Sequence, residues 1–88
     1  MHYVYTLCSL KDKDLYVGRT NNLRRRLTEH NNGESFATAP RRPFVLVYYE
    51  AYTDEEDSVR REKSLKRRGQ ARVHLMKRIA ASIRRAQN

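Results

Sequence analysis

The strongest folding signal in this chain is a near-continuous apolar run from Phe44 to Ala51. β-Branched and aromatic residues fill the run, as is typical of a strand. Because polar residues do not alternate with apolar ones, we expect both faces of the strand to be covered, as in the central strand of a small sheet. The chain has only 88 residues, which predicts at most one compact domain over 1–88, with one small core and no deep cofactor cavity.

Two shorter segments with strand character precede this run. They cover His2 to Cys8 and Leu15 to Gly18, and the polar residues Lys11 to Asp14 separate them. This arrangement predicts a hairpin with a loop of several residues. Along the first strand, Tyr5 and its alternate neighbours point to one face of the sheet, and Val4 points to the other.

The first predicted helix follows the hairpin. Asn21 or Asn22 caps it, and it runs from about Leu23 to His30, before the stop signal at Asn32-Gly33. Residues 33–43 contain a glycine and two prolines among small polar side chains, which is typical of a loop.

Two further helices are expected after the apolar run. Thr53 and Glu56 form a capping box, which predicts a helix that ends near Arg68. A last, basic helix covers about 70–86, with its apolar residues on one side. The element order is therefore ββαβαα. It predicts an α+β fold in which helices flank a small antiparallel three-stranded sheet.

Charge is divided unequally along the chain. The 19 Lys and Arg and 10 Asp and Glu give a net charge of +9. Residues 1–62 hold ten basic and ten acidic side chains, whereas residues 63–88 hold nine basic and no acidic ones. An acid-free basic segment favours a polyanionic partner, nucleic acid first, over a merely solvated helix or a membrane surface.

Membrane, disulfide and zinc classes are not expected. The single cysteine, Cys8, permits no internal disulfide and no cysteine-based zinc site, and it fits a reducing compartment, the cytoplasm. No apolar run is long enough to span a membrane, and no signal peptide is recognisable, so no membrane association is predicted.

Charged side chains interrupt the apolar faces of two predicted helices. On the first helix, Arg26 and His30 share the arc of the apolar residues. Taken singly, Arg26 is expected to extend its guanidinium to the edge, and His30 to be a satisfied boundary residue. On the second helix, Glu62 lies in the middle of an apolar face and needs a cation. That cation is Arg26 in a structural salt bridge, a metal ion, or Lys66.

The hairpin tyrosines add a chemical function to these charges. Any one strand tyrosine is usually plain packing, but Tyr5 and Tyr16 accompany an inward Arg26, His30 and Glu62, and we expect the five to converge on one patch. Such a patch suits phosphodiester hydrolysis. A divalent ion bound to the glutamate would neutralise negative charge on the phosphate, and the arginine would do the same. A tyrosine would activate water.

Several motifs at consistent spacing resemble those of the GIY-YIG nucleases. Tyr3-Val4-Tyr5 and Tyr16-Val17-Gly18 stand ten residues apart, and the segment from Arg19 to His30 is similar to the family's following stretch. Arg41-Arg42-Pro43 and Arg61-Glu62 with Leu65-Lys66 extend the resemblance to about residue 79. The small stand-alone branch, similar to the nuclease module of the bacterial nucleotide-excision-repair incision enzyme, is the best match.

The resemblance implies roles for five residues. Tyr5 and Tyr16 would be the active-site tyrosines, Arg26 the phosphate-stabilising arginine, His30 the histidine that assists the first tyrosine, and Glu62 the metal ligand. The chain departs from the family pattern in two positions. The first triplet begins with tyrosine instead of glycine, and no late asparagine precedes Asn88, although His74 lies in that region.

The expected function is a DNA endonuclease that depends on Mg²⁺ or Mn²⁺, with possible structure specificity in repair or recombination and no small-molecule cofactor. A homodimer or protein partner would allow both strands to be cut. The alternatives are a catalytically weak or inactive nucleic-acid-binding module, and a structural or interaction domain. The side chains expected to contact DNA are basic: Arg19, Arg25, Lys66, Arg67, Arg68, Arg72 and Lys77.

Overall fold

A three-stranded antiparallel sheet organises the computed structural model, which describes residues 1–88. Along the chain, the elements are β1 (His2–Ser9), β2 (Leu15–Thr20), α1 (Leu23–Asn31), a 3-10 turn η1 (Ala39–Arg41), β3 (Phe44–Tyr52), α2 (Glu55–Lys66), α3 (Gln70–Arg78) and α4 (Ala80–Gln87). The expected α+β class and the three-stranded antiparallel sheet are confirmed. None of the helices has the length and apolar character that crossing a membrane requires.

The strand order is β2-β1-β3, so the central strand is β1 and the apolar run forms an edge strand. The expectation of a central Phe44 strand was therefore wrong. Thr6 pairs with Tyr48 and Leu7 pairs with Leu46, which leaves Val47 as an extra residue in a bulge of β3. Because the bulge interrupts the regular alternation and helices pack on both sides of β3, its residues are apolar without the strand being central.

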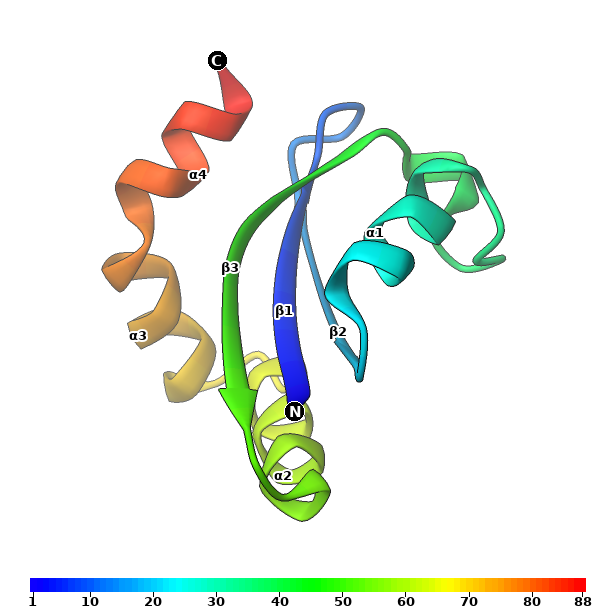
Figure 1. Ribbon diagram of the computed structural model, residues 1–88. Coiled ribbons are helices and arrows are strands. Elements are labelled where there is room, and N and C mark those ends of the chain that lie inside the picture. The colour runs from blue at the N-terminus through cyan, green and yellow to red at the C-terminus, as the bar shows by residue number, and fades with distance from the viewer.

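Helices cover the two faces of the sheet separately (Figure 1). On one face, α1 packs on a cluster built around Tyr5, Leu7 and Phe44. On the other face, α2, α3 and α4 pack on a cluster that contains Val4 and Val17. Consecutive residues of β1 therefore serve opposite faces, as the period of a strand requires, and the prediction for Tyr5 and Val4 is confirmed.

The helix ends differ in part from the expected ones. Asn22 caps α1, since its side chain accepts a hydrogen bond from the backbone N–H of Arg25. The cap of α2 is Asp54, which accepts from the N–H of Glu56 at 2.8 Å, and not Thr53. Thr53 is excluded because β3 continues to Tyr52 and leaves it in the connecting bend. Asp is as good an N-cap as Thr, so nothing is lost.

The expected single helix over 70–86 is two helices. The backbone turns out of helical geometry at Ile79 (φ −108°, ψ 23°), although neither Gly nor Pro is present. Ile79 is buried in the same cluster as Leu75, and the turn allows both α3 and α4 to follow the surface of the sheet. Figure 1 shows the resulting bend between the two helices.

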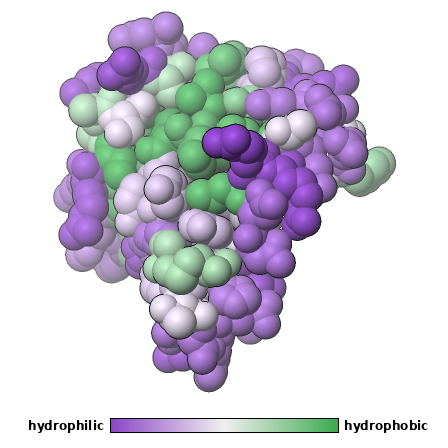
Figure 2. Space-filling view, viewed as in Figure 1, coloured by the Kyte–Doolittle hydropathy of each residue, from purple (hydrophilic) through white to green (hydrophobic).

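Part of the apolar surface that remains uncovered lies along β3. Val45 and Tyr49 are exposed, and Leu46, Val47 and Tyr48 line a shallow hollow with Tyr49. Figure 2 shows apolar residues across the middle of this face, with hydrophilic residues around them.

Candidate active site

A chain of three buried side chains joins β1, α1 and the following loop. The Tyr5 hydroxyl lies 2.8 Å from Nε2 of His30, and Nδ1 of His30 lies 2.7 Å from the Thr38 hydroxyl. His30 and Thr38 are completely buried, and Tyr5 is almost so. Far from being a boundary residue, His30 is thus the centre of a buried hydrogen-bonded network.

The hydrogen bonds of Thr38 decide which ring nitrogen of His30 carries the proton. The Thr38 hydroxyl donates to the carbonyl of Ser35 at 3.5 Å, so its lone pair faces Nδ1. The tautomer that keeps all three hydrogen bonds has N–H at Nδ1 and a bare Nε2, which accepts from the Tyr5 O–H. Burial, with the nearby Arg26 charge, lowers the pKa of His30, which keeps the ring neutral and Nε2 available.

The Tyr5 phenol keeps its proton at neutral pH in this setting. Burial raises its pKa to about 12, while Arg26 acts in the opposite direction. Tyr5 therefore acts as a hydrogen-bond donor. Its hydroxyl loses the proton only when a base accepts it and nearby positive charge stabilises the phenolate. His30 supplies that acceptor.

The glycine of the second triplet is required by the position of Tyr5. Tyr5 and Gly18 are register partners on β1 and β2. A Cβ at position 18 would lie 2.3 Å from the Tyr5 hydroxyl oxygen, far closer than van der Waals contact. The missing side chain of Gly18 is the space that the phenol occupies, so the two motif triplets meet in the structure.

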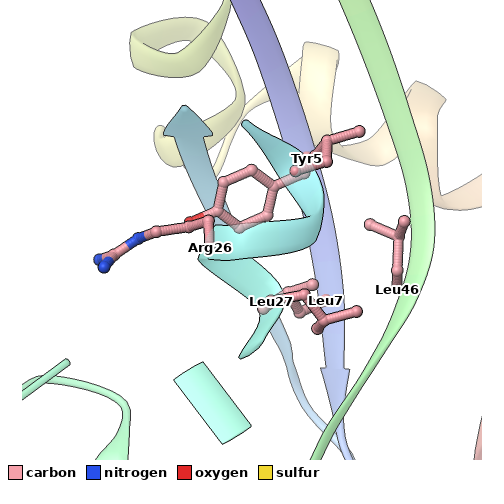
Figure 3. Close-up of a pocket in the computed structure, with 6 residues that line it drawn as sticks. Tyr5, Leu7, Arg26, Leu27 and Leu46 are labelled. Atoms are coloured by element: carbon pink, nitrogen blue, oxygen red, sulfur yellow. The ribbon is translucent and has the colours of Figure 1, made fainter. Parts of the chain in front are cut away.

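Arg26 lies beside Tyr5 but directs its charge outward. Its stem lines a small apolar hollow with Tyr5, Leu27 and Leu46, and this hollow leaves no room for a water molecule. Figure 3 shows the guanidinium outside the hollow, as expected for an arginine that extends its charge to the edge. There it donates to Glu29 at 3.0 Å and to the Ser35 hydroxyl at 3.3 Å.

Glu62 pairs with cations other than Arg26. Its carboxylate, mostly covered, lies 3.1 Å from Nζ of Lys66 and 3.6 Å from Nε of Arg19. The expectation of a structural bridge to Arg26 was wrong, because Arg26 is engaged by Glu29 on its own helix. Of the two protein cations that were expected, Lys66 is the one that pairs with Glu62.

Tyr16 and Lys66 connect Glu62 to the histidine. The rings of Tyr16 and His30 lie 5.3 Å apart edge to face, and Nζ of Lys66 lies 5.7 Å from the centre of the Tyr16 ring. The charge of Glu62 also contributes to raising the pKa of Tyr5, after the larger effect of burial. The five expected site residues therefore form one connected group at the edge of β2, where α1 and α2 approach from opposite faces.

The expected DNA-contacting residues are spread over the molecule. Arg19 is paired with Glu55 and Glu62, and Arg25 with Glu29. Arg72 is mostly covered and lies 4.0 Å from Asp14. Arg67, Arg68 and Lys77 are exposed and form no ion pair. Since α3 packs on the face opposite α1, Lys77 lies across the sheet from the Tyr5–His30 pair.

Thr38 and Ser35 are the site residues that the sequence analysis missed. Both lie in the segment 33–43, which is read from the sequence only as a loop. Their roles come from contacts with α1 across eight or nine residues. A small hydroxyl residue between Gly33 and Pro40 carries no spacing signal, so the sequence offered no means of selecting these two.

Comparison with known proteins fits this geometry. Residues 1–78 match the family described as "GIY-YIG catalytic domain". The chain belongs to the GIY-YIG family. The suspected resemblance is confirmed, and membership implies an endonuclease-type activity.

The similar proteins are small relatives within this family. A UPF0213 protein of Staphylococcus haemolyticus is 42% identical over 74% of this chain and 79% of its own length. A UPF0213 protein of Clostridium perfringens is 43% identical over 76% of this chain and 72% of its own length. The solution NMR structure of the UPF0213 protein BH0048 from Bacillus halodurans has 34% identity and a TM-score of 0.51, covering 85% of this chain and 80% of that one.

The GIY-YIG site offers a single carboxylate to a metal. No group of three or more His, Cys, Asp or Glu side chains gathers where it would hold an ion. The half-buried oxygens of Glu62 already attract two cations, Lys66 and Arg19, so they are a favourable place for positive charge. One hard oxygen donor fits Mg²⁺, which keeps most of its water ligands in proteins, and also Mn²⁺.

Proposed function

We propose that this GIY-YIG protein is a metal-dependent DNA endonuclease that hydrolyses phosphodiester bonds. The observation that carries the proposal is the Thr38–His30–Tyr5 chain of hydrogen bonds, which presents a neutral imidazole to a phenol beside the Arg26 side chain. A structural core gains little from a polar chain of this kind, because apolar side chains would fill the same space without the cost of removing polar groups from water.

In the proposed reaction, Tyr5 activates the attacking water. The Tyr5 oxygen takes a proton from water as its own proton passes to Nε2 of His30, and the Thr38 hydroxyl holds the Nδ1–H of the resulting imidazolium. The hydroxide oxygen bonds to phosphorus, the P–O bond to the leaving strand breaks, and the leaving oxygen takes a proton from solvent. His30 then releases its extra proton to solvent, which restores the neutral ring.

Arg26 and Glu62 handle the charge of the phosphate. The guanidinium, which ends outside the hollow, donates to the phosphate oxygens as negative charge develops. Mg²⁺ or Mn²⁺ on Glu62 would add positive charge at the scissile phosphate and its leaving oxygen. Tyr16 contacts both His30 and Lys66, and it thereby positions the Tyr5–His30 pair relative to Glu62 and its lysine partner.

A cleavage series tests this proposal. Purified protein is incubated with supercoiled plasmid, branched DNA and single-stranded DNA, in Mg²⁺, in Mn²⁺ and in EDTA. Wild type is expected to cut only with metal, and Glu62→Gln is expected not to cut. Glu56→Gln is the matched control, because Glu56 is on the same helix, is exposed and has the same charge. Equal cutting by wild type and Glu62→Gln would contradict the proposal and indicate a contaminating nuclease.

The second candidate is a nucleic-acid-binding module with weak or no turnover. The double pairing of Glu62 favours it, since Lys66 and Arg19 must leave the carboxylate before a metal can bind. Binding of DNA by both wild type and Glu62→Gln, without cutting by either, would establish it. Lys66→Met separates the two cases, because removing the competing cation should raise the apparent affinity for Mg²⁺ only in a metal-using enzyme.

A further inference from the structure

One large apolar side chain stands almost fully in solvent beside the candidate site. Phe36 is 97% exposed, more than any other large hydrophobic residue, and Tyr49, on β3, reaches only 52%. An exposed phenylalanine gains nothing from folding, since hydrophobic stabilisation comes from area removed from water. Packing in the hydrophobic core therefore does not explain why a phenylalanine stands at position 36.

The loop that carries Phe36 is held in place at both sides. The N–H of Thr38 and the N–H of Ala39 donate to the Ser35 carbonyl at 3.1 and 2.9 Å, which makes Ser35 to Thr38 a tight turn with Phe36 at its second position. In Figure 1, the segment between α1 and β3 projects outward from the sheet. A residue at this corner of the turn points away from the protein.

The two ends of this turn are bonded to the site itself. The Ser35 hydroxyl accepts from Arg26, and the Thr38 hydroxyl accepts from His30. The turn of Phe36 is thus bonded through Ser35 to the guanidinium proposed to hold the phosphate and through Thr38 to the proposed proton acceptor. A strand whose phosphate lies on Arg26 would therefore pass the turn that carries this ring.

We propose that Phe36 is a stacking platform for an unpaired nucleobase next to the phosphate that Arg26 binds. The proposal rests on the proposed function, and it deepens it by naming the substrate class, DNA with an unpaired base at the cleavage point. Stacking on aromatic side chains is how single-stranded bases are held without sequence reading. In a regular duplex both faces of each base are already stacked, so an open face exists only where strands are unpaired.

The surroundings of the ring favour a base over a protein or a membrane. Its neighbours Glu34, Pro40 and Arg42 are exposed, so the ring is isolated and is not part of a broad apolar patch. Arg42 has no acidic partner and donates only to the carbonyl of Ala39. A flat ring on a segment that also carries Arg42 and is bonded to Arg26 offers both an aromatic face and cations to a nucleic-acid strand.

A tryptophan reporter tests the proposal directly, because the chain has no tryptophan. The emission of Phe36→Trp is followed in EDTA, without cleavage, as DNA is added: a single strand, the matching blunt duplex, and an abasic strand of the same length. Anisotropy of labelled DNA measures binding in parallel. Quenching by the base-bearing single strand, with little change from the duplex or the abasic strand, is the expected result.

Control variants show whether the effect belongs to this position. Val73→Trp places the reporter on α3, on the opposite face of the sheet, where no base-dependent quenching is expected. Phe36→Ala is expected to weaken single-strand binding about tenfold, Phe36→Tyr to keep it, and Phe36→Leu to behave like Phe36→Ala. Equal affinities for Phe36→Leu and wild type would show a merely apolar contact and overturn the stacking.

The outcomes separate this proposal from the proposed function. Single-strand binding by Phe36→Trp without a change in emission overturns the platform, whether or not the wild type cuts DNA. Base-dependent quenching without metal-dependent cutting supports the platform and leaves a binding module. A wild type that binds no form of DNA overturns both.

Discussion

The two faces of the sheet are built by different means from the same central strand. On the α2–α4 face, Val4 and Val17 pack with Leu65, Leu75 and Ile79 in an apolar cluster. At its margin, the Glu50 carboxylate accepts hydrogen bonds from Tyr48 and Arg61. On the α1 face, apolar residues share the interior with the hydrogen-bonded chain of Tyr5, His30 and Thr38.

The difference indicates a division of labour. Apolar contact is non-directional, so the buried cluster of the α2–α4 face supplies stability with little demand on geometry. Hydrogen bonds among buried groups are directional and costly when incomplete, so the α1 face holds a defined arrangement. Variants of the two faces should therefore separate loss of activity from loss of stability.

Tyr5→Phe is expected to have the largest effect, and on activity. Removing the hydroxyl removes the group proposed to activate water, which should lower the cleavage rate by about 10²- to 10⁴-fold. Stability should fall by only about 1–3 kcal/mol, because Nε2 of His30 is left without its partner. Single-turnover cleavage and urea unfolding measure the two quantities. Tyr49→Phe, the same change at an exposed site, should alter neither, and cutting by Tyr5→Phe at the Tyr49→Phe rate would remove Tyr5 from the mechanism.

Leu65→Ala should show the opposite pattern. Leu65 is completely buried in the apolar cluster, so its truncation should lower the free energy of unfolding by about 2–5 kcal/mol. Leu27→Ala, on the half-buried surface of α1, should cost less. Urea unfolding measures both variants. A larger loss of unfolding free energy for Leu27→Ala than for Leu65→Ala would mean that the α1 face, and not the α2–α4 face, supplies most of the stability.

Gly18→Ala tests how closely the two motif triplets fit. The new methyl group would lie 2.3 Å from the Tyr5 hydroxyl oxygen, so the phenol must move. Misplacement on this scale should lower the cleavage rate by about 10²-fold. Gly69→Ala is the matched control, since a Cβ there meets nothing within 4 Å. Unchanged cutting by Gly18→Ala would mean that the position of Tyr5 does not control the reaction.

The pH dependence of stability should reveal the buried histidine. The pKa of His30 is lowered in the folded protein, chiefly by burial, relative to about 6.5 in the unfolded chain. The unfolded state therefore binds more protons just below pH 6.5, and stability should fall as pH decreases through that window toward the folded pKa. Urea unfolding from about pH 7 to about pH 5 measures it. His30→Gln should flatten the dependence, whereas the exposed His74→Gln should retain it.

The smallest expected effects concern the surface cations. Arg67 follows Lys66 at the end of α2, near the site, whereas Lys77 lies on α3 across the sheet. If DNA contacts the edge of β2, where α1 and α2 approach the site, Arg67→Ala should reduce the salt dependence of binding by about 0.9 log units per tenfold salt, and Lys77→Ala by less. Equal reductions would mean that DNA also follows the surface of α3.

Most of the local structure follows from the sequence. The hairpin, the Asn22 cap and the alternation of Val4 and Tyr5 depend on neighbouring residues, whose preferences are visible in any window of the chain. The motif triplets and Glu62 also identified the family, because their joint spacing is specific. The edge position of β3, the cap at Asp54 and the break at Ile79 did not follow, since they depend on competition between elements.

The sequence by itself determined the charged and aromatic residues of the site, and the tertiary structure decided how they are paired and which hydroxyl side chains join them. Glu62 needs a cation whatever the fold, but only the approach of α2 to β2 selects Lys66 and Arg19 over Arg26. Thr38 sets the tautomer of His30 through a contact that no spacing rule predicts. The physical reason is that burial and hydrogen bonding depend on distance in space, which the order of residues fixes only after the chain has folded.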